Sequence, residues 1–249
     1  MESDIGTPSQ DNILSTSLPN QWVMYRYDKQ LFKKIANRPN FQAKPHKELC
    51  TLDTINDLIY LMQLMETKCN RSGEFAGRRN LDSNDYIIMR KGIEPIWEDP
   101  KNWNGGTFTI KMSHTNGFNV WSLFVMHMLG ETLTEEMQYI NGITVSYISD
   151  SGNPNTPSDR LAKPNNYTYI KIWDGKPDRT REQFISSLPK DIYDNISTES
   201  LQYSQNNKKN DFNKEGIVGK LANERNQGGF KTTRGRGRER ESNYGRRRY

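Results

Sequence analysis

The sequence predicts an α+β fold in which three helices pack on one face of a mostly antiparallel sheet. Segments that alternate apolar and polar residues arrive in pairs, as the strands of hairpins do, and stretches with helical spacing separate them. The 249 residues suffice for one domain of ordinary size with two tails, and we find no internal repeat. We expect a flexible arm over residues 1–17, a folded domain over 18–206 and a disordered tail over 207–249.

Six segments have the pattern of strands. The clearest alternation predicts that Tyr169, Lys171 and Trp173 lie on one face of a strand and that Ile170 and Ile172 lie on the other. The remaining predicted strands cover residues 21–27, 86–89, 107–112, 143–148 and 201–203.

Three segments have helical spacing of apolar residues. The first begins near Asp53, which we expect to cap it, and the third covers about 179–188, where Pro189 ends it. The second covers about 118–133. The stretches from Asp28 to about Lys47, 70–84 and 149–166 are polar or rich in breakers and are typical of loops.

Charge is concentrated in the tail. The chain has a net charge of +5, but residues 231–249 contain Lys231 and seven arginines against Glu239 and Glu241, a local balance of +6, which leaves −1 for residues 1–230. A domain that grips long RNA by its phosphates is usually basic itself. The sequence therefore favours a domain that recognises a small, defined group, followed by an Arg-Gly tail of the kind that binds RNA weakly or stays solvated.

Composition limits compartment and chemistry. Hydrophobic content of 33% and mean hydropathy of −0.93 indicate some disorder. We see no secretory signal and no apolar run long enough to cross a membrane, so we expect a cytoplasmic monomer. Cys50 and Cys69 form no C-x-x-C pair, and His46, His114 and His127 are scattered, which argues against a metal site, a bound cofactor and a disulfide.

The segment Ile93–Pro100, closed by Gly105 and Gly106, is the most informative in the chain. It places the indole of Trp97 beside the carboxylate of Glu98 in a loop bracketed by prolines. An indole next to a bidentate acceptor suits a cationic base with two N–H donors on its edge, and guanine methylated at N7 is such a base. The alternative is a packed tryptophan beside a solvated glutamate in a turn.

The segment Ile93-Glu94-Pro95-Ile96-Trp97-Glu98-Asp99-Pro100, with Asn102 and the two glycines, resembles the signature of the eukaryotic translation initiation factor 4E family, which binds the mRNA 5′ cap. Weaker landmarks follow in the family's order: Trp22–Tyr25, Leu52–Asp57, Trp121–Glu131, Asn141–Ile143, Ile172–Trp173 and Arg181–Glu182. The resemblance implies a curved sheet with three helices on its convex face and a cap slot on its concave face. The departures indicate a divergent member, of viral or protist origin.

The resemblance implies that the methylated guanine stacks on Trp97, that Glu98 accepts from its N1–H and amine, and that Trp173 touches the N7-methyl group. Where the family has a second stacking tryptophan, this chain has Phe41, a smaller ring and a weaker cation–π partner. Phe32 and Tyr25 are alternatives for this second stacking face. The backbone N–H of Trp97 or of Trp103 donates to O6, and the family implies Trp97.

The phosphate end of the expected slot has changed. The alignment places Ile148 and Tyr169 where the family has basic side chains, and neither carries charge. We expect Lys171, which shares a face with Trp173, to bind the cap phosphates. Arg160 and Lys163 of the preceding loop are further candidates; the alternative for both is ordinary solvated loop charge.

On the helical side, the resemblance implies a surface for a Tyr-x-x-x-x-Leu-φ peptide from a scaffold factor or a repressor. Ile59 stands where the family has a tryptophan, Ser122 replaces an apolar contact, and Ile55 and Met126 match two others. The alternative is that Ile59 belongs to the core stripe of its helix. We therefore expect a non-enzymatic initiation factor that recruits a scaffold, with a cap-binding repressor and a tail-driven general RNA-binding protein as alternatives. A decapping hydrolase is disfavoured because Glu135–Glu136 stands alone.

Overall fold

The computed structural model describes residues 13–36, 45–66, 84–150 and 165–207, which belong to one compact unit. The predicted N-terminal arm, apart from its last five residues, and the Arg-Gly tail lie outside the described residues, as do Phe41, Arg160 and Lys163. Within the described ranges, no helix is long and apolar enough to cross a membrane.

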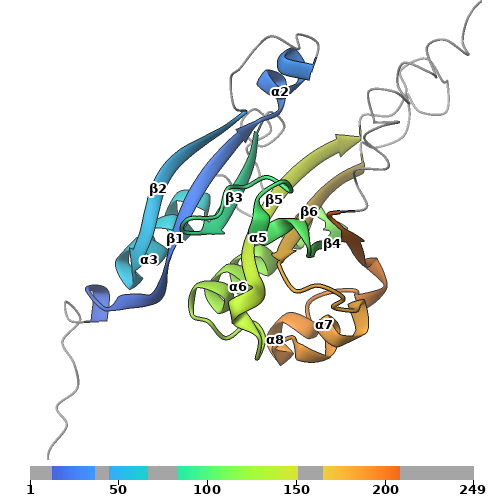
Figure 1. Ribbon diagram of the computed structural model, residues 1–249. Helices are drawn as coiled ribbons and strands as arrows, with labels where there is room; N and C mark the ends of the chain where they lie inside the picture. Colours follow the sequence, from blue (N-terminus) through green and yellow to red (C-terminus); the bar gives the residue numbers. More distant parts are fainter. Residues whose placement is uncertain (1–12, 37–44, 67–83, 151–164, 208–249) are drawn as a thin grey trace, which may run out of the picture. The chain divides into compact units, whose positions relative to one another are not determined.

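A seven-stranded sheet forms the centre of the unit (Figure 1), and every pair of neighbouring strands is antiparallel. In spatial order the strands are β2 (His46–Thr54), β1 (Ser17–Asp28), β3 (Asn84–Arg90), β5 (Ile140–Asp150), β6 (Asn165–Asp174), β4 (Gly106–Ser113) and β7 (Leu201–Gln205). Six of these strands lie where alternation predicts them.

The two faces of the sheet have different environments. Trp22 and Met24 of β1, Ile88 of β3 and Ile170 and Ile172 of β6 point into the main core. The residues between them point to the opposite side, where Ile87, Met89 and Ile93 form a smaller cluster with Tyr25, Tyr27 and Trp173. We call this opposite side the front face. Period-two alternation explains why one set of strands builds both a core and a binding face.

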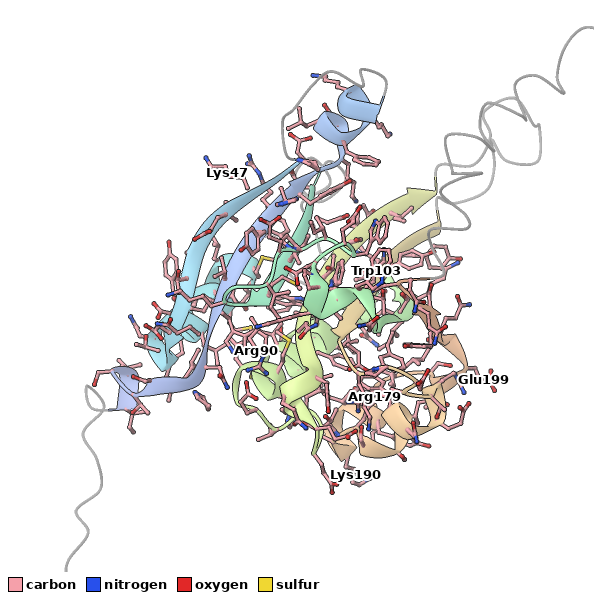
Figure 2. The ribbon with its side chains drawn as sticks, viewed as in Figure 1. Lys47, Arg90, Trp103, Arg179, Lys190 and Glu199 are labelled. Carbon is pink, nitrogen blue, oxygen red and sulfur yellow. The ribbon has the colours of Figure 1, made fainter. Side chains whose placement is uncertain are left out.

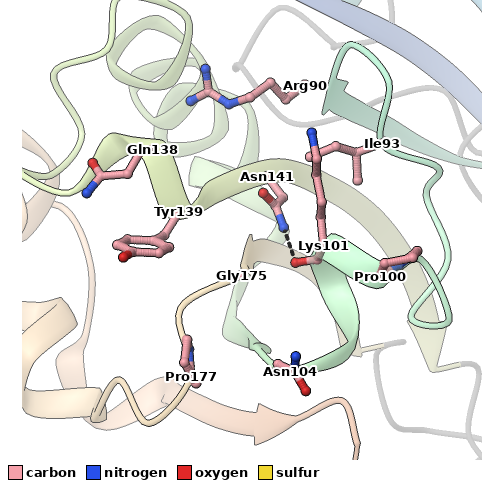
Figure 3. Close-up of a pocket in the computed structure, with 10 residues that line it drawn as sticks. All are labelled: Arg90, Ile93, Pro100, Lys101, Asn104, Gln138, Tyr139, Asn141, Gly175 and Pro177. Atoms are coloured by element: carbon pink, nitrogen blue, oxygen red, sulfur yellow. Dashed lines mark hydrogen bonds between the residues drawn. The ribbon is translucent and has the colours of Figure 1, made fainter.

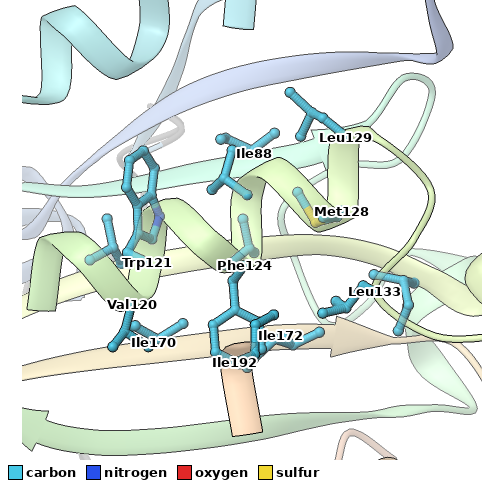
Figure 4. Packing of buried hydrophobic residues seen from close by; sticks show 14 of the residues in the cluster. Ile88, Val120, Trp121, Phe124, Met128, Leu129, Leu133, Ile170, Ile172 and Ile192 are labelled. Carbon is cyan, nitrogen blue, oxygen red and sulfur yellow. The ribbon is translucent and has the colours of Figure 1, made fainter. Parts of the chain in front are cut away.

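The helices that cover the core face are α3 (Ile55–Glu66), α6 (Gly117–Leu129), α7 (Arg181–Ser187) and the short α8 (Lys190–Tyr193). Helix α6 lies across the sheet and buries Trp121, Phe124 and Met128 against Ile170, Ile172 and their neighbours (Figure 4). Phe184 of α7 stacks on Phe108 of β4 with ring centroids 4.0 Å apart. The predicted fold class is therefore confirmed, and the third helical region is two helices separated by Pro189.

The remaining elements are α2 (Lys29–Ala36), α5 (Pro100–Trp103) and the 3₁₀ turns η1 (His114–Asn116), η2 (Met137–Tyr139) and η3 (Thr198–Ser200). Helix α2 falls where we expected a loop, and strand β2 begins at the end of that loop, continues over residues that we had assigned to no element and ends where we expected the first helix to begin. Only Leu52 of β2 is buried, so this edge strand lacks the alternation that marks a half-buried one.

The cap of α3 also differs from the prediction. Thr54 Oγ1 accepts from the backbone N–H of Asp57, and the Asp57 carboxylate accepts from the backbone N–H of Thr54, which is the reciprocal pattern of a capping box. Asp53 instead accepts from the side-chain amide of Gln21 on β1. Threonine therefore caps α3, and the aspartate ties the start of the helix to the sheet.

The packing of α6 should dominate stability. Phe124 is fully buried, and Phe124→Ala should cost about 3–5 kcal/mol, which corresponds to a fall in Tm of roughly 6–20 °C. Met126→Ala, on the exposed side of the same helix, should shift Tm by no more than about 2 °C. Thermal unfolding followed by circular dichroism measures both, and equal shifts would contradict the assignment of the core face.

Candidate functional site

The signature loop, residues 93–106, is held by the buried side chain of Asn102. Only 1% of Asn102 is exposed, and its Nδ2 donates to the carbonyl oxygens of Glu94, at 3.1 Å, and Ile96, at 2.8 Å. Its Oδ1 accepts from Nδ2 of Asn141 on β5 at 2.9 Å. Because buried amides need partners, this arrangement ties the loop backbone just before Trp97 to Asn102, five residues after it.

Asp99 and a second asparagine complete the anchor. The Asp99 carboxylate caps α5 by accepting from the backbone N–H of Lys101 and closes the loop by accepting from the backbone N–H of Glu94, each at 2.9 Å. Asn206, just after β7, donates from Nδ2 to the carbonyl oxygen of Asn102 at 2.7 Å. The loop is therefore bonded to β5 and to the end of β7, two strands that are far apart in the sequence.

Gly105 is required by a close backbone approach. A Cβ at this position would lie 1.9 Å from the carbonyl oxygen of Asp174 at the end of β6. No side chain fits there without moving the backbone of the loop or of β6. The glycine that the sequence places after α5 therefore seats the loop against the strand that contains Trp173.

A pocket of about 320 Å³ lies between α5 and the start of β5 (Figure 3). Asn141 Nδ2, in its wall, donates to the carbonyl oxygen of Lys101 at 2.8 Å. The residues that line it are Arg90, Ile93, Pro100, Lys101, Asn104, Gln138, Tyr139, Asn141, Gly175 and Pro177. The predicted base-binding residues are not among them, so this pocket belongs to the loop's anchor.

Trp97 stacks on a ring that sequence reasoning did not assign. Its indole lies 5.4 Å from that of Trp103, centroid to centroid, with the planes inclined by 26°. Both indoles are half-buried, and the neighbouring Glu98 is exposed. Figure 2 labels Trp103 beside α5. The available signal was an aromatic residue six positions after Trp97, but spacing within an irregular loop does not show which rings meet.

The backbone N–H groups of Trp97 and Trp103, the two donors that we considered for guanine O6, differ in their hydrogen bonds. The N–H of Trp103 donates to the carbonyl oxygen of Asp99 at 2.9 Å inside α5. It is therefore committed to the helix, and the N–H of Trp97 is the remaining one of the two donors that we considered for guanine O6.

Trp173 lies on the front face, half-buried in the same cluster as Ile93, the first residue of the signature loop. Its Nε1 donates to Thr144 Oγ1 of β5 at 2.9 Å, which fixes the orientation of the indole. Among the described residues, no ring contact joins Trp173 to Trp97. The structure thus brings the loop and Trp173 into one region without a direct stack between the two tryptophans.

The two alternatives for the second stacking face have other partners. Phe32 of α2 lies 5.8 Å from Tyr27, and Tyr25 lies 6.2 Å from His46, centroid to centroid. Burial, with the nearby carboxylates of Glu48 and Glu94, raises the pKa of the Tyr25 phenol, and burial beside Asp85 raises that of Tyr27. Both phenols therefore stay neutral at physiological pH.

The front face of β6 continues from Trp173 to Lys171, which is half-buried. Within the part of the chain that the structure describes, Lys171 forms no ion pair with a carboxylate. Ile148 is 47% exposed at the far end of β5, and Tyr169 is half-buried. Lys111 of β4, which sequence reasoning did not select, lies opposite Tyr169.

On the helical side, Ile59 of α3 is 40% exposed and Met126 of α6 is 44% exposed. Ile55 and Ser122 are half-buried on the same two helices, which contact each other. The core stripe of α3 consists instead of the buried Leu61 and Met65. Ile59 is therefore not a core residue.

Among the described residues, no group of histidine, cysteine, aspartate and glutamate side chains could hold a metal ion.

A family model for eukaryotic initiation factor 4E matches residues 17–220. The chain belongs to this family.

The chain is similar to a viral protein, as we expected for a divergent member of the 4E family. The chain is 55% identical over 249 residues to the eukaryotic translation initiation factor 4E homolog of Acanthamoeba polyphaga mimivirus, covering 90% of this chain and 92% of that protein. It is 25% identical over 142 residues to initiation factor 4E of Xenopus laevis, covering 55% and 59% of the two chains.

Solved structures of 4E proteins have the same fold. The complex of C. elegans eIF4E-3 with the 4E-binding protein Mextli matches with a TM-score of 0.54 and 20% identity, covering 78% of this chain and 95% of that one. The complex of Ascaris suum eIF4E-3 with the m7G cap matches with a TM-score of 0.51 and 16% identity, covering 77% and 91%.

Asn102→Ala should loosen the loop by leaving the carbonyl oxygens of Glu94 and Ile96 without their amide donor. The variant loses the three side-chain hydrogen bonds of Asn102, each worth about 0.5–1.5 kcal/mol, so we expect a loss of at least about 1.5 kcal/mol in the free energy of unfolding. Asn104→Ala, at an exposed position two residues on, should change it by less than about 0.5 kcal/mol. Urea unfolding measures both, and equal stability of the two variants would refute the anchoring role.

Proposed function

We propose that this protein binds the 7-methylguanosine 5′ cap of mRNA and acts, without catalysing a reaction, in cytoplasmic translation initiation. The observation that supports this most strongly is the anchored signature loop. Asn102 and Asp99 hold the backbone around Trp97 and Glu98 before any ligand arrives, and membership of the 4E family gives the reason for such a loop. A ligand that meets a preformed site loses less binding energy to ordering.

The base would be read by stacking and by paired hydrogen bonds. Methylation at N7 makes guanine cationic, and a cation is attracted to the face of an indole, so Trp97 favours the methylated base. The exposed Glu98 carboxylate accepts from N1–H and the exocyclic amine, while the backbone N–H of Trp97 donates to O6. Trp173 contacts the methyl group from the front face, and Phe41 supplies the second stacking ring.

The triphosphate would be bound by Lys171, with Arg160 and Lys163 of the preceding loop closing over it. Lys171 is two residues from Trp173 on the same face of β6, and it has no carboxylate partner among the described residues. Its charge is therefore available to an anion. Ile148 and Tyr169 add no charge at this end, so we expect a weaker grip on the phosphates than basic side chains at those two positions give.

Complexes of related proteins support the same assignment. Structures similar to this one hold the m7G cap and the m2,2,7G cap in Ascaris suum eIF4E-3, and the protein Mextli with a cap analog in C. elegans eIF4E-3. By analogy we propose capped mRNA as one partner of this monomer. A helical peptide, on a surface formed by Ile55, Ile59, Ser122 and Met126, is the other.

The peptide surface allows two functions. Exposed Ile59 and Met126 favour recruitment of a scaffold factor, since unpaired apolar side chains on adjacent helices suit an amphipathic helix. A cap-binding repressor is the second candidate, because Ile59 and Ser122 replace the side chains that the family uses there. A third candidate function, which does not involve this surface, is binding of RNA by the Arg-Gly tail alone. It predicts that RNA affinity depends steeply on salt and does not depend on the cap.

Glu98→Gln should weaken binding of 7-methyl-GTP and of GTP, because both nucleotides carry the N1–H and amine donors, and the stacking on Trp97 should still favour the methylated base. The change keeps the shape of the side chain and removes the charge that both N–H donors use. Hydrogen bonds to charged groups are worth about 1.5–3 kcal/mol, so we expect affinity for 7-methyl-GTP to fall roughly 10- to 150-fold. Quenching of tryptophan fluorescence by 7-methyl-GTP and by GTP measures the affinity and the preference.

Glu199→Gln, an exposed glutamate in η3 (Figure 2), is the matched control and should leave both affinities unchanged. Equal binding of 7-methyl-GTP and GTP by the unchanged protein would refute the proposal.

Ile59→Asp should weaken binding of a Tyr-x-x-x-x-Leu-φ peptide at least about 10-fold, because it places a charge where the peptide's apolar side would rest. Titration calorimetry measures this, with Lys190→Ala on α8 as a surface control. Affinity for 7-methyl-GTP should not change in either variant. If the unchanged protein binds no such peptide, scaffold recruitment through this surface is excluded and the repressor remains.

A further inference from the structure

The front face beyond the predicted base site carries a strip of lysines and tyrosines. Tyr167, Tyr169 and Lys171 occupy alternate positions of β6 and therefore share the face of Trp173. In β4, Lys111 is directly opposite Tyr169, so it joins the same face. We call Lys111, Tyr167, Tyr169 and Lys171 the lysine–tyrosine strip.

Lys111 rests on the tyrosine rings. Its Nζ lies 3.8 Å from the ring centroid of Tyr167 and 6.0 Å from that of Tyr169. Lys111 is exposed and both tyrosines are half-buried. Within the described ranges, neither Lys111 nor Lys171 pairs with a carboxylate. Among the described residues, the strip therefore combines lysines that have no carboxylate partner with flat aromatic faces.

This combination is what single-stranded nucleic acid requires. Lysines attract the phosphates, while an aromatic ring stacks on any base because every base has a flat π-face. An acidic peptide would use the lysines but not the rings. Because the strip continues the face of Trp173, RNA attached to a cap held there would already lie beside it.

The lysine–tyrosine strip is also long enough to contact a nucleotide beyond the triphosphate. From Trp173 to Tyr167 is six residues of β-strand, or about 20 Å at 3.3 Å per residue. Lys171 lies at the near end of this span, beside Trp173. Tyr167 and Lys111 lie toward the far end, past the position where we place the triphosphate.

We infer that the strip is a second binding site, for the nucleotide that follows the cap: Tyr167 stacks on its base and Lys111 binds the phosphodiester on its 3′ side. This inference rests on the proposed cap binding. In the free protein, Lys111 covers the Tyr167 ring. On binding, the ammonium group shifts to the phosphodiester and the base takes its place on the ring.

Replacing the lysine on the Tyr167 ring by a base should increase the net binding affinity. A base stacked on an aromatic side chain strengthens binding roughly 5- to 150-fold, whereas a cation over a ring at an exposed site contributes roughly 2- to 5-fold. The lysine also keeps a partner throughout, since it leaves the ring for a phosphate.

Three ligands separate the two contacts. 7-Methyl-GTP has only the methylated nucleoside and the triphosphate, m7GpppA adds adenosine on the terminal phosphate, and m7GpppApG adds a phosphodiester and a guanosine. We expect the protein to bind m7GpppA about 10-fold more tightly than 7-methyl-GTP, and m7GpppApG about 3-fold more tightly again. The last step should make the slope of log affinity against log salt steeper by about 0.7, as for one additional phosphate contact on a single strand.

Variants assign each step to its residue. Tyr167→Leu should remove the gain from m7GpppA, and Lys111→Ala should remove the gain from m7GpppApG together with its added salt dependence. Both should bind 7-methyl-GTP within about 2-fold of the unchanged protein. Lys190→Ala on α8, which removes the same charge at a position well away from Trp103 in Figure 2, should change nothing. Because Lys111 is exposed, its variant tests the inference even if Tyr167→Leu fails to fold.

The outcomes are distinguishable. If the three capped ligands bind equally, or if Lys111→Ala keeps the full gain from m7GpppApG, the second site is refuted while the cap site stands. If an acidic peptide competes for the strip and the dinucleotide does not, the strip is a protein-binding surface. If 7-methyl-GTP and GTP bind equally, the proposed function itself fails.

Discussion

The hydrogen bonds of Asn102 are the constraint on which the site depends. A primary amide has two N–H donors and one oxygen acceptor, and all three have partners here. The donors bind the carbonyl oxygens of Glu94 and Ile96 in the loop, and the oxygen accepts from Asn141 on β5. Because the Asn102 side chain is buried, losing any of these partners would leave a polar group inside the protein without a hydrogen bond, which favours this conformation of the loop. Trp97 and Glu98 lie inside the segment that these bonds close, so the geometry of the candidate site depends on a buried side chain outside the residues that we assign to the base.

Successive residues of the sheet strands point to opposite faces, so the core and the front face are built from different residues. Even-numbered positions of β1, β3 and β6 build the core beneath the helices, and odd-numbered positions form the front face. A substitution on the front face therefore leaves the packing of α6 undisturbed. This separation lets the residues of the front face diverge while the fold persists, which agrees with a fold shared at 16–20% identity with solved 4E proteins.

How much the sequence predicts depends on whether a residue's environment is periodic. The strands and helices around the core were predictable because burial on one face imposes a repeat of two or of 3.6 residues. Edge strand β2 was not, since only Leu52 is buried and no repeat results. The Trp97–Trp103 stack and the contact of Lys111 with Tyr167 were not predictable for a different reason. Both depend on side-chain directions across a loop or across strands, and sequence spacing does not specify these.

At the proposed phosphate end, the charges that the family resemblance implies are absent, but lysines lie at neighbouring positions of the sheet. The resemblance implies cations at the positions of Ile148 and Tyr169, and this chain has none there. Yet the cross-strand neighbour of Tyr169 is Lys111, and the next residue on its own face of β6 is Lys171. Side chains directly opposite on antiparallel strands have Cβ atoms about 4.5–5.5 Å apart, a distance that a lysine side chain can span. Positive charge therefore lies next to Tyr169 both along β6, at Lys171, where we propose that it binds the cap triphosphate, and across the sheet, at Lys111, where we infer that it binds the phosphodiester of the next nucleotide. The tyrosine that occupies the vacated place adds an aromatic face beside the charge, which a basic residue there would not provide. A loss of charge at single positions of the sequence is thus accompanied, on the folded sheet, by lysines and a tyrosine at adjacent positions, and this arrangement is the basis on which we infer a second nucleotide site beside the cap.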